Sequence, residues 1–271
     1  MIGSAALAGK TGSSVSDEVV ARQRVALGAA TEGKGFGPQS PRDIRISDGS
    51  NDRAFKEAPN LTKMTLCDIH FHKSAEHRGG MFTTFVGNGD GQGNGTGFEY
   101  DGKLTKAELE PVKGEIGGSD HGDLAPGDTI EVHFVYSTAD ATLGNSLATC
   151  FDEVTANPQL RVEAVIGVLV NDSNAASFLE MTQIESINGL NQVPFFPENL
   201  GDPVLYAGST TGPDYNEKGS PFQVTWSVRP EVLKIYISSL FAWLDHNQFN
   251  EDHAHGVRNL VVNPDLLSEI D

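Results

Sequence analysis

The sequence is constrained most by two short stretches of alternating character, residues 67–72 (Cys-Asp-Ile-His-Phe-His) and residues 129–135 (Thr-Ile-Glu-Val-His-Phe-Val). Successive side chains of an extended strand point to opposite faces of a sheet. His70 and His72 therefore share one face of the first predicted strand, and apolar residues form the other face. If the second strand is a neighbour, His133 joins them at one point. Three histidines with an open fourth position are typical of a catalytic zinc site rather than of a closed structural one.

An acidic residue stands two positions before a histidine in each of these strands. Asp68 precedes His70 on the same face, and Glu131 precedes His133 in the same way. Metal-bound imidazoles usually donate their second ring nitrogen to an outer partner such as a carboxylate. A single His-x-His pair is as often two unrelated histidines, so the repeated acidic neighbour is what favours metal binding.

Length and charge narrow the classes of function. The 271 residues can bury a full core and suit one sizeable domain. The formal net charge of −18 and the sequence pI near 4.7 argue against nucleic acid and anionic membranes as partners. No apolar run is long enough to span a bilayer. We therefore expect a globular protein that binds neither nucleic acid nor a membrane, and a homodimer is compatible with the sequence.

The remaining sequence indicates short strands separated by long loops, with few helices. Residues 1–34 are predicted to form a partly helical N-terminal arm, and residues 35–271 a single β-dominated domain. Residues 177–188 are the best helix candidate in that domain. The glycine-rich stretch 87–97 cannot carry a stable helix or strand. We therefore expect a peripheral insertion at about residues 87–128.

The chain has two cysteines, Cys67 and Cys150, and each lies close to one of the predicted histidine strands. A disulfide between them is therefore geometrically plausible, and two buried thiols are the alternative. A disulfide would indicate an oxidising compartment, so we expect a secreted or periplasmic protein.

Several motifs resemble, in the same order, those of carbonic anhydrases of the δ class and, behind them, of the α class. The run Cys-Asp-Ile-His-Phe-His-Lys-Ser-Ala-Glu-His at residues 67–77 looks specifically δ-like. The other stretches are similar to α-class motifs, and they are residues 39–44, 131–135, 164–168, 206–213 and 224–226. The resemblance implies a mainly β fold with a few helices, in which a central twisted, mostly antiparallel sheet holds zinc in a conical cleft. The implied activity is the interconversion of carbon dioxide and bicarbonate by zinc-bound hydroxide.

The same resemblance implies a role for individual residues. Zn²⁺ would be held by His70, His72 and His133, and Thr211 would orient the nucleophile while donating its hydroxyl proton to Glu76. Asp68, Glu131 and His77 would stand behind the ligands as outer partners. The apolar wall that receives carbon dioxide would contain Val135, Val165, Val224 and Trp226.

Two other classes remain open. A cupin also uses His-x-His with a following glutamate, and would bind iron or manganese with Glu76 as a ligand to act on another small molecule. It explains neither Gln39-Ser40-Pro41 nor Val224-Thr225-Trp226. A non-catalytic module related to carbonic anhydrase would usually lack one ligand histidine, whereas this chain has all three. Identification of the bound metal and the rate of carbon dioxide hydration separate the three readings.

Overall fold

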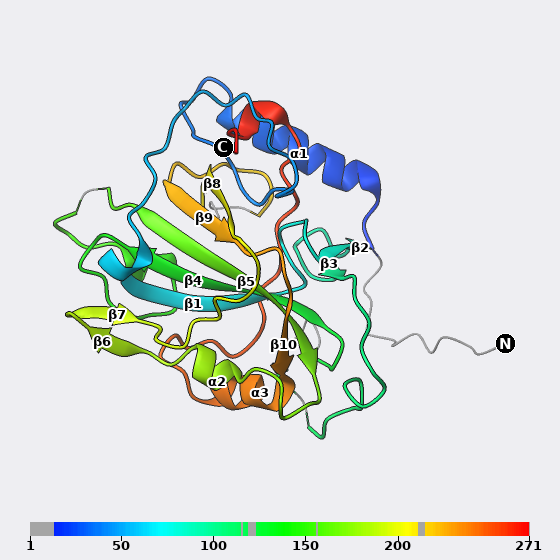
Figure 1. The fold of residues 1–271 in the computed structure, drawn as a ribbon. Coiled ribbons are helices and arrows are strands. Elements are labelled where there is room, and N and C mark those ends of the chain that lie inside the picture. Colours follow the sequence, from blue (N-terminus) through cyan, green and yellow to red (C-terminus); the bar gives the residue numbers. More distant parts are fainter. Residues whose placement is uncertain (1–13, 115, 119–122, 156, 211–214, 271) are drawn as a thin grey trace.

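The computed structural model describes residues 14–114, 116–118, 123–155, 157–210 and 215–270. Its centre is a six-stranded sheet with the strand order β1-β4-β5-β9-β8, in which β10 also pairs with β5 (Figure 1). β5 pairs in parallel with β9 and β10, and the other neighbours are antiparallel. These strands are β1 (Thr65–Lys73), β4 (Thr129–Ser137), β5 (Leu160–Val170), β8 (Val204–Gly208), β9 (Val224–Val228) and β10 (Leu233–Tyr236). The expected mainly β fold with a central, mostly antiparallel sheet is confirmed.

Few helices accompany the sheet. They are α1 (Asp17–Thr31), α2 (Phe178–Met181) and α3 (Ile237–Asp245), with short 3₁₀ turns at Leu61–Lys63, Leu147–Cys150 and Pro264–Leu266. α1 buries Val20, Gln23 and Leu27, whose spacing of three and four residues places them on one helical face. α2 and α3 lie together on the opposite side of the molecule from α1 (Figure 1). Within the described residues, no helix has the length and apolar character needed to cross a membrane.

The register between β1 and β4 brings the histidines together. The Cα partners are His70 with His133, and His72 with Glu131. A register shift between Leu66 and Asp68 marks a β-bulge early in β1. Because directly opposite residues of paired strands share a face, the alternation expected from the sequence places His70 and His133 side by side.

Each face of the central sheet is covered by its own buried apolar cluster. The back face packs Phe71 and Phe134 against Phe178 of α2 and Trp243 of α3. The other face carries the three histidines, and we call it the metal face. Its apolar cluster contains Val135, Val162, Val224 and Trp226. β5 is buried along its whole length because it lies in the middle of the sheet with both faces covered.

An antiparallel hairpin flanks the glycine-rich stretch, and its strands are β2 (Phe82–Asn88) and β3 (Thr96–Tyr100). Outside the predicted insertion, a second small hairpin joins β6 (Glu185–Ile187) to β7 (Leu190–Gln192). The prediction that residues 87–97 lack strand structure is therefore wrong at both ends of that stretch. The turn between β2 and β3 is made of residues with positive φ, among them Gly89, Gly91 and Gly93, and the glycines supply this turn without preventing the flanking strands. The division of the chain into an arm and one domain at residue 34 stays a prediction.

Candidate metal centre

His70, His72 and His133 converge on one point of the metal face. Each offers one ring nitrogen, and these nitrogens all lie within 4.8 Å of one another. The Nε2 atom of His70 is 3.2 Å from the Nδ1 atom of His133. Ligands of a tetrahedral zinc at about 2.0–2.1 Å lie roughly 3.3 Å apart, so this spacing fits zinc.

Two of the outward-facing ring nitrogens are bound by carboxylates. His70 Nδ1 lies 2.6 Å from Asp68 Oδ2, and His133 Nε2 lies 2.7 Å from Glu131 Oε1. An ionised carboxylate can only accept hydrogen bonds, so each imidazole must donate its N–H outward. With a neutral ring, the inward nitrogen of both His70 and His133 is then a lone pair available to a metal.

The third ring is fixed by a main-chain carbonyl. His72 Nδ1 donates to the carbonyl oxygen of Gly256 at 2.9 Å, and a carbonyl also can only accept. The inward Nε2 of His72 therefore presents a lone pair as well. All three imidazoles are held in the tautomer that a metal site requires.

The electrostatics of the site favour the neutral form of two of the three histidines. Burial lowers the pKa of His133 to about 4. Burial and the neighbouring histidines His133 and His70 hold the pKa of His72 well below its usual range. Burial also acts against protonation of His70, but the charge and hydrogen bond of Asp68 outweigh it and raise the pKa of His70. Neutral imidazoles leave the full double charge of a bound zinc uncompensated by its ligands.

Glu131 is the centre of a buried hydrogen-bond network behind the ligands. Its Oε1 accepts from His133 Nε2 at 2.7 Å and from His77 Nδ1 at 2.6 Å, and its Oε2 accepts from the main-chain N–H groups of Glu76 and His77. His77 Nε2 in turn accepts from the Tyr206 hydroxyl at 2.6 Å. Burial alone would raise the pKa of Glu131, but the charges and hydrogen bonds of His77 and His133 hold it well below its usual range.

Glu76 is buried next to this network, but on the outer side of the histidines. The main-chain N–H of Arg258 donates to Glu76 Oε1 at 2.8 Å, and the same oxygen lies 3.7 Å from His72 Nδ1. Burial, with the charge of Glu131 nearby, raises the pKa of Glu76 to about 7. Glu76 is not grouped with the inward nitrogens of the three histidines, which is where a cupin would require it. Thr211, the expected partner of Glu76, lies outside the described residues.

An apolar wall stands beside the histidines. Val135 and Trp226 belong to the cluster on the metal face, and the Trp226 ring centroid is 5.1 Å from that of His133. Val224 belongs to the same cluster. Val162 pairs with Trp226 across β5 and β9 and extends this wall.

Val165 does not belong to this wall, which corrects the expectation from the sequence. It is directly opposite Val132 in the β4–β5 register and packs in the cluster on the back face. Ala164 is the residue opposite His133. A shift of one residue along a strand moves a side chain to the other face, so the motif likeness assigned the wrong parity to β5.

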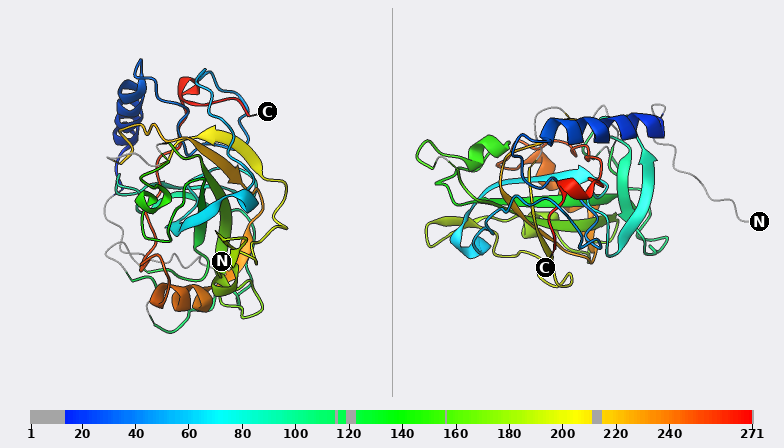
Figure 2. Two further views of the ribbon diagram at one scale, coloured as in Figure 1. Left: turned by 90° about the vertical axis from the view of Figure 1, so that its left-hand side faces the viewer. Right: turned by 90° about the horizontal axis from the view of Figure 1, so that it is seen from above.

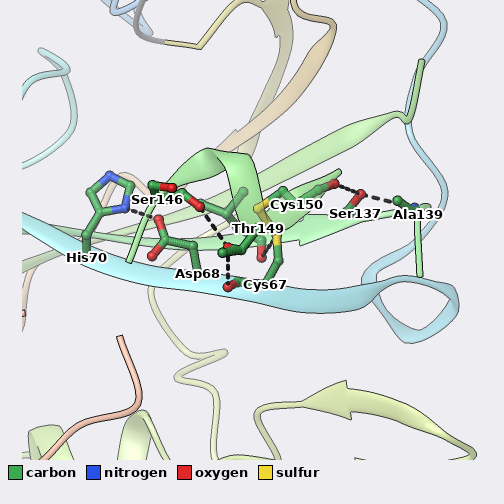
Figure 3. Close-up of a disulfide and its surroundings, with 9 residues drawn as sticks. Cys67, Asp68, His70, Ser137, Ala139, Ser146, Thr149 and Cys150 are labelled. Atoms are coloured by element: carbon green, nitrogen blue, oxygen red, sulfur yellow. Dashed lines mark hydrogen bonds and ion pairs between the residues drawn. A yellow bond between two sulfur atoms is a disulfide. The ribbon is translucent and has the colours of Figure 1, made fainter. Parts of the chain in front are cut away.

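The two cysteines form a disulfide beside the site. Cys67 and Cys150 are joined, with Cα atoms 5.2 Å apart, as expected (Figure 3). The bulge in β1 places Cys67 in the cluster of the metal face, whereas Leu66 packs on the back face. Figure 3 shows Cys67 next to Asp68, whose carboxylate reaches His70. The disulfide therefore ties the 3₁₀ turn at Leu147–Cys150 to the strand that carries two of the histidines.

Sequence reasoning missed the contribution of the segment after α3. The His255 ring is stacked on the His70 ring, with centroids 5.2 Å apart and planes 21° apart. His255 Nε2 lies 2.8 Å from a Glu251 carboxylate oxygen. The pattern His253-Ala254-His255 repeats the alternation seen in β1 and was the available signal. The Gly256 carbonyl carries no side-chain signal and could not have been found.

Three convergent histidines on a β-sheet, each with its second ring nitrogen bound to an acceptor, are features of a metal site. A family model described as delta carbonic anhydrase matches residues 61–239, which is well over half of the chain. The chain belongs to the delta carbonic anhydrase family and is a carbonic anhydrase.

Solved structures similar to this chain are also carbonic anhydrases. The alpha-carbonic anhydrase of Photobacterium profundum is 17% identical, with 91% of this chain and 95% of that chain covered and a TM-score of 0.29. The alpha-carbonic anhydrase of Thermovibrio ammonificans, in complex with the inhibitor sulfanilamide, is 16% identical, with coverage of 80% and 83% and a TM-score of 0.26. A hyperthermostable carbonic anhydrase from an active hydrothermal vent chimney is 16% identical, with coverage of 88% and 90% and a TM-score of 0.30. These scores are too low to carry an argument, so the assignment rests on the family match. No curated protein matches the chain.

Proposed function

We propose that this carbonic anhydrase holds one Zn²⁺ with His70, His72 and His133 and uses it to interconvert carbon dioxide and bicarbonate. The observation that supports this most directly is the set of three inward lone pairs, each fixed because the other ring nitrogen donates to an acceptor. When bound, zinc lowers the pKa of a coordinated water to about 7, a magnitude established on carbonic anhydrase itself.

The protein's own residues have three tasks in this proposal. Asp68 and Glu131 hold the ligand tautomers and donate negative charge to the imidazoles. Thr211 donates its single hydroxyl proton to Glu76, so only its lone pairs face the nucleophile. Glu76 is suited to this because it is buried and one of its oxygens already accepts from the main chain of Arg258.

The substrate is received by an apolar surface. Carbon dioxide is apolar and competes poorly with water at polar surfaces, so it requires a dry wall close to the metal. Val135, Val224 and Trp226 supply such a wall in the proposal, and Val162 takes the place first given to Val165.

The disulfide supports a proposal for the compartment of the protein. A bridge between Cys67 and Cys150 persists in an oxidising environment. We therefore propose that the protein is secreted or periplasmic.

Substitutions of a ligand and of an orienting residue separate the roles. His133→Ala should lose zinc and hydration activity together, because it removes a ligand. Thr211→Ala should keep zinc but lower kcat roughly a hundred- to thousandfold, which is the cost of about 2.7–4 kcal/mol for one positioned hydrogen bond in the transition state. Thr211→Ser keeps the hydroxyl and should restore most of the activity. Stopped-flow hydration and metal analysis of each purified variant measure both properties.

Glu76→Gln distinguishes this proposal from a cupin. An amide can donate to Thr211 and reverse its hydroxyl, so kcat should fall while zinc stays bound. Full hydration activity in Glu76→Gln would remove the proposed link between Thr211 and Glu76. Loss of metal from Glu76→Gln, with iron or manganese in the unmodified protein, would instead support a cupin-type site.

A further inference from the structure

We propose that the glycine-rich turn between β2 and β3, residues 89–95, is a positioning element of the metal centre that acts on His72 through the segment 255–258. This inference rests on the proposed zinc chemistry. It gives a role to the part of the insertion that the sequence indicated only as peripheral.

The segment 255–258 runs alongside the end of β1 and supplies main-chain partners to two site residues. The Gly256 carbonyl accepts from His72 Nδ1 at 2.9 Å, and the Arg258 N–H donates to Glu76 at 2.8 Å. The segment is itself joined to β1, because the His255 N–H donates to the Phe71 carbonyl at 2.8 Å. This segment lies outside the family match, which ends at residue 239.

The turn is hydrogen-bonded to this segment at Val257, which lies between the residues that contact His72 and Glu76. The N–H of Val257 donates to the carbonyl of Gly93 at 3.0 Å. Val257 stands directly between Gly256 and Arg258, so the position of the Gly93 carbonyl sets the position of both main-chain partners. A shift of the turn therefore moves the acceptor that fixes the His72 tautomer.

The turn is stiffened by Asp90. One Asp90 carboxylate oxygen accepts from the main-chain N–H of Gln92 at 2.7 Å and from that of Asn94 at 3.1 Å. The other accepts from the Asn94 side-chain amide at 2.8 Å, and the Asp90 N–H donates to the Asn94 carbonyl. These bonds enclose Gly93 and fix the direction of its carbonyl.

The close approach of the two segments requires glycine. Gly93 has φ +102, and a Cβ added there would lie 2.0 Å from the Tyr215 hydroxyl oxygen and 2.7 Å from the Val257 carbonyl oxygen. A Cβ added at Gly256 would lie 3.0 Å from the Gly93 carbonyl carbon. No side chain fits between the turn and the segment, so the two backbones pack directly against each other.

Helix α1 holds the turn from its other side. The buried Gln23 side chain donates to the Gly91 carbonyl at 2.8 Å and accepts from the Asn259 side chain at 2.8 Å. Gln23 thus bridges the turn and the residue after the segment. The right-hand view of Figure 2 shows α1 along one edge of the molecule, with its N-terminal end near the β2–β3 hairpin. Helix α1, the turn of residues 89–95 and the segment 255–258 therefore form one packed unit, which contacts His72 through its Nδ1 atom.

The test compares two glycines of the same hairpin. Gly93→Ala introduces the clash, whereas Gly87→Ala is a matched control because Gly87 also has a positive φ, of +113, but no atom within 4 Å of an added Cβ. Zinc affinity is measured by competition with a chelator, and the geometry of the site by the visible absorption spectrum of the cobalt-substituted protein. We expect Gly93→Ala to weaken zinc binding roughly ten- to a hundredfold, as for loss of an outer partner, and to change the cobalt spectrum. Gly87→Ala should leave both unchanged.

Two further variants make the result decisive. If Gly93→Ala does not fold, Asp90→Ala, which loosens the turn without a clash, should weaken zinc binding while Asp90→Asn retains more of it.

The outcomes also separate this proposal from the proposed function. A folded Gly93→Ala with unchanged zinc affinity and cobalt spectrum overturns the positioning role, even if the unmodified enzyme hydrates carbon dioxide. Equal losses in Gly93→Ala and Gly87→Ala overturn it as well. An unmodified protein that binds no zinc overturns the proposed function instead.

Discussion

Glu131→Gln is the substitution that tests most directly how the sheet prepares its ligands. Glu131 is fully buried and accepts four hydrogen bonds, two from imidazoles and two from main-chain N–H groups. A glutamine can turn its amide in two ways. If its NH₂ faces His77 and His133, both rings must switch tautomer, and His133 then carries a proton on the nitrogen that should bind zinc.

The alternative orientation has a cost that the structure allows us to estimate. If the NH₂ faces the main chain, the N–H groups of Glu76 and His77 lose their acceptor and cannot switch roles. An unsatisfied buried donor costs about 1–3 kcal/mol, so zinc binding to the variant should be opposed by at least about 2 kcal/mol. This corresponds to a loss of roughly 30-fold in zinc affinity. The metal-free variant avoids the cost by taking the first orientation, so its stability should change much less.

The assay is zinc competition with a chelator, combined with thermal unfolding of the metal-free proteins. Glu163→Gln is the control, because Glu163 is another buried glutamate of the central sheet that accepts from Arg161 and Arg229 and is opposite Phe134 on the back face. It should lose stability, by about 3–5 kcal/mol for a broken buried ion pair, but keep its zinc affinity. Zinc affinity of Glu131→Gln within threefold of the unmodified protein, or an equal loss in Glu163→Gln, would refute the reasoning.

Two predictions concern stability alone. The disulfide closes a loop of 83 residues and so restricts the unfolded chain. The double variant Cys67→Ala, Cys150→Ala should therefore lower the free energy of unfolding by about 4.5 kcal/mol and Tm by roughly 8 °C. A Tm equal to that of the oxidised protein would contradict this prediction. Burial opposes ionisation of Glu163, but its hydrogen bonds with Arg161 and Arg229 lower its pKa in the folded protein. The ionised Glu163 therefore contributes to stability at pH values above its pKa in the unfolded chain, about 4.3, and this contribution is lost as pH falls. Urea unfolding of Glu163→Gln should therefore depend less on pH below about 4 than that of the unmodified chain, and identical pH profiles would show that Glu163 contributes nothing.

The sequence predicted the side-chain faces wherever strict alternation continued through a strand. His70 and His72 needed only a period of two, and an acidic residue two positions earlier indicated the outer partners of His70 and His133. These relations are local, so they survive into the folded protein. The structure brings these residues together as the alternation indicated.

The predictions failed where the outcome depends on pairing between distant segments. Val165 was placed by likeness to a motif, but the β4–β5 register decides its face. The helix expected over residues 177–188 is limited to Phe178–Met181, and the residues after it form the β6–β7 hairpin, whose turn places Asn188 and Gly189 at positive φ. Both the register of β5 and the length of α2 depend on tertiary contacts, which a single sequence does not reveal.

The outer partners of the three ligands differ in charge, and this difference determines how much negative charge the buried site must offset. Asp68 and Glu131 bring two negative charges to a buried site, whereas Gly256 brings a neutral carbonyl. Two buried carboxylates need compensation. The charge of Glu131 is compensated by the four hydrogen-bond donors that surround its carboxylate. Asp68 Oδ2 accepts from His70 Nδ1 at 2.6 Å, and although burial acts against protonation of His70, the charge and hydrogen bond of Asp68 raise the pKa of that imidazole. In the proposed function, a zinc ion held by the three imidazoles would bring two positive charges to the site and so would offset the charges of both carboxylates.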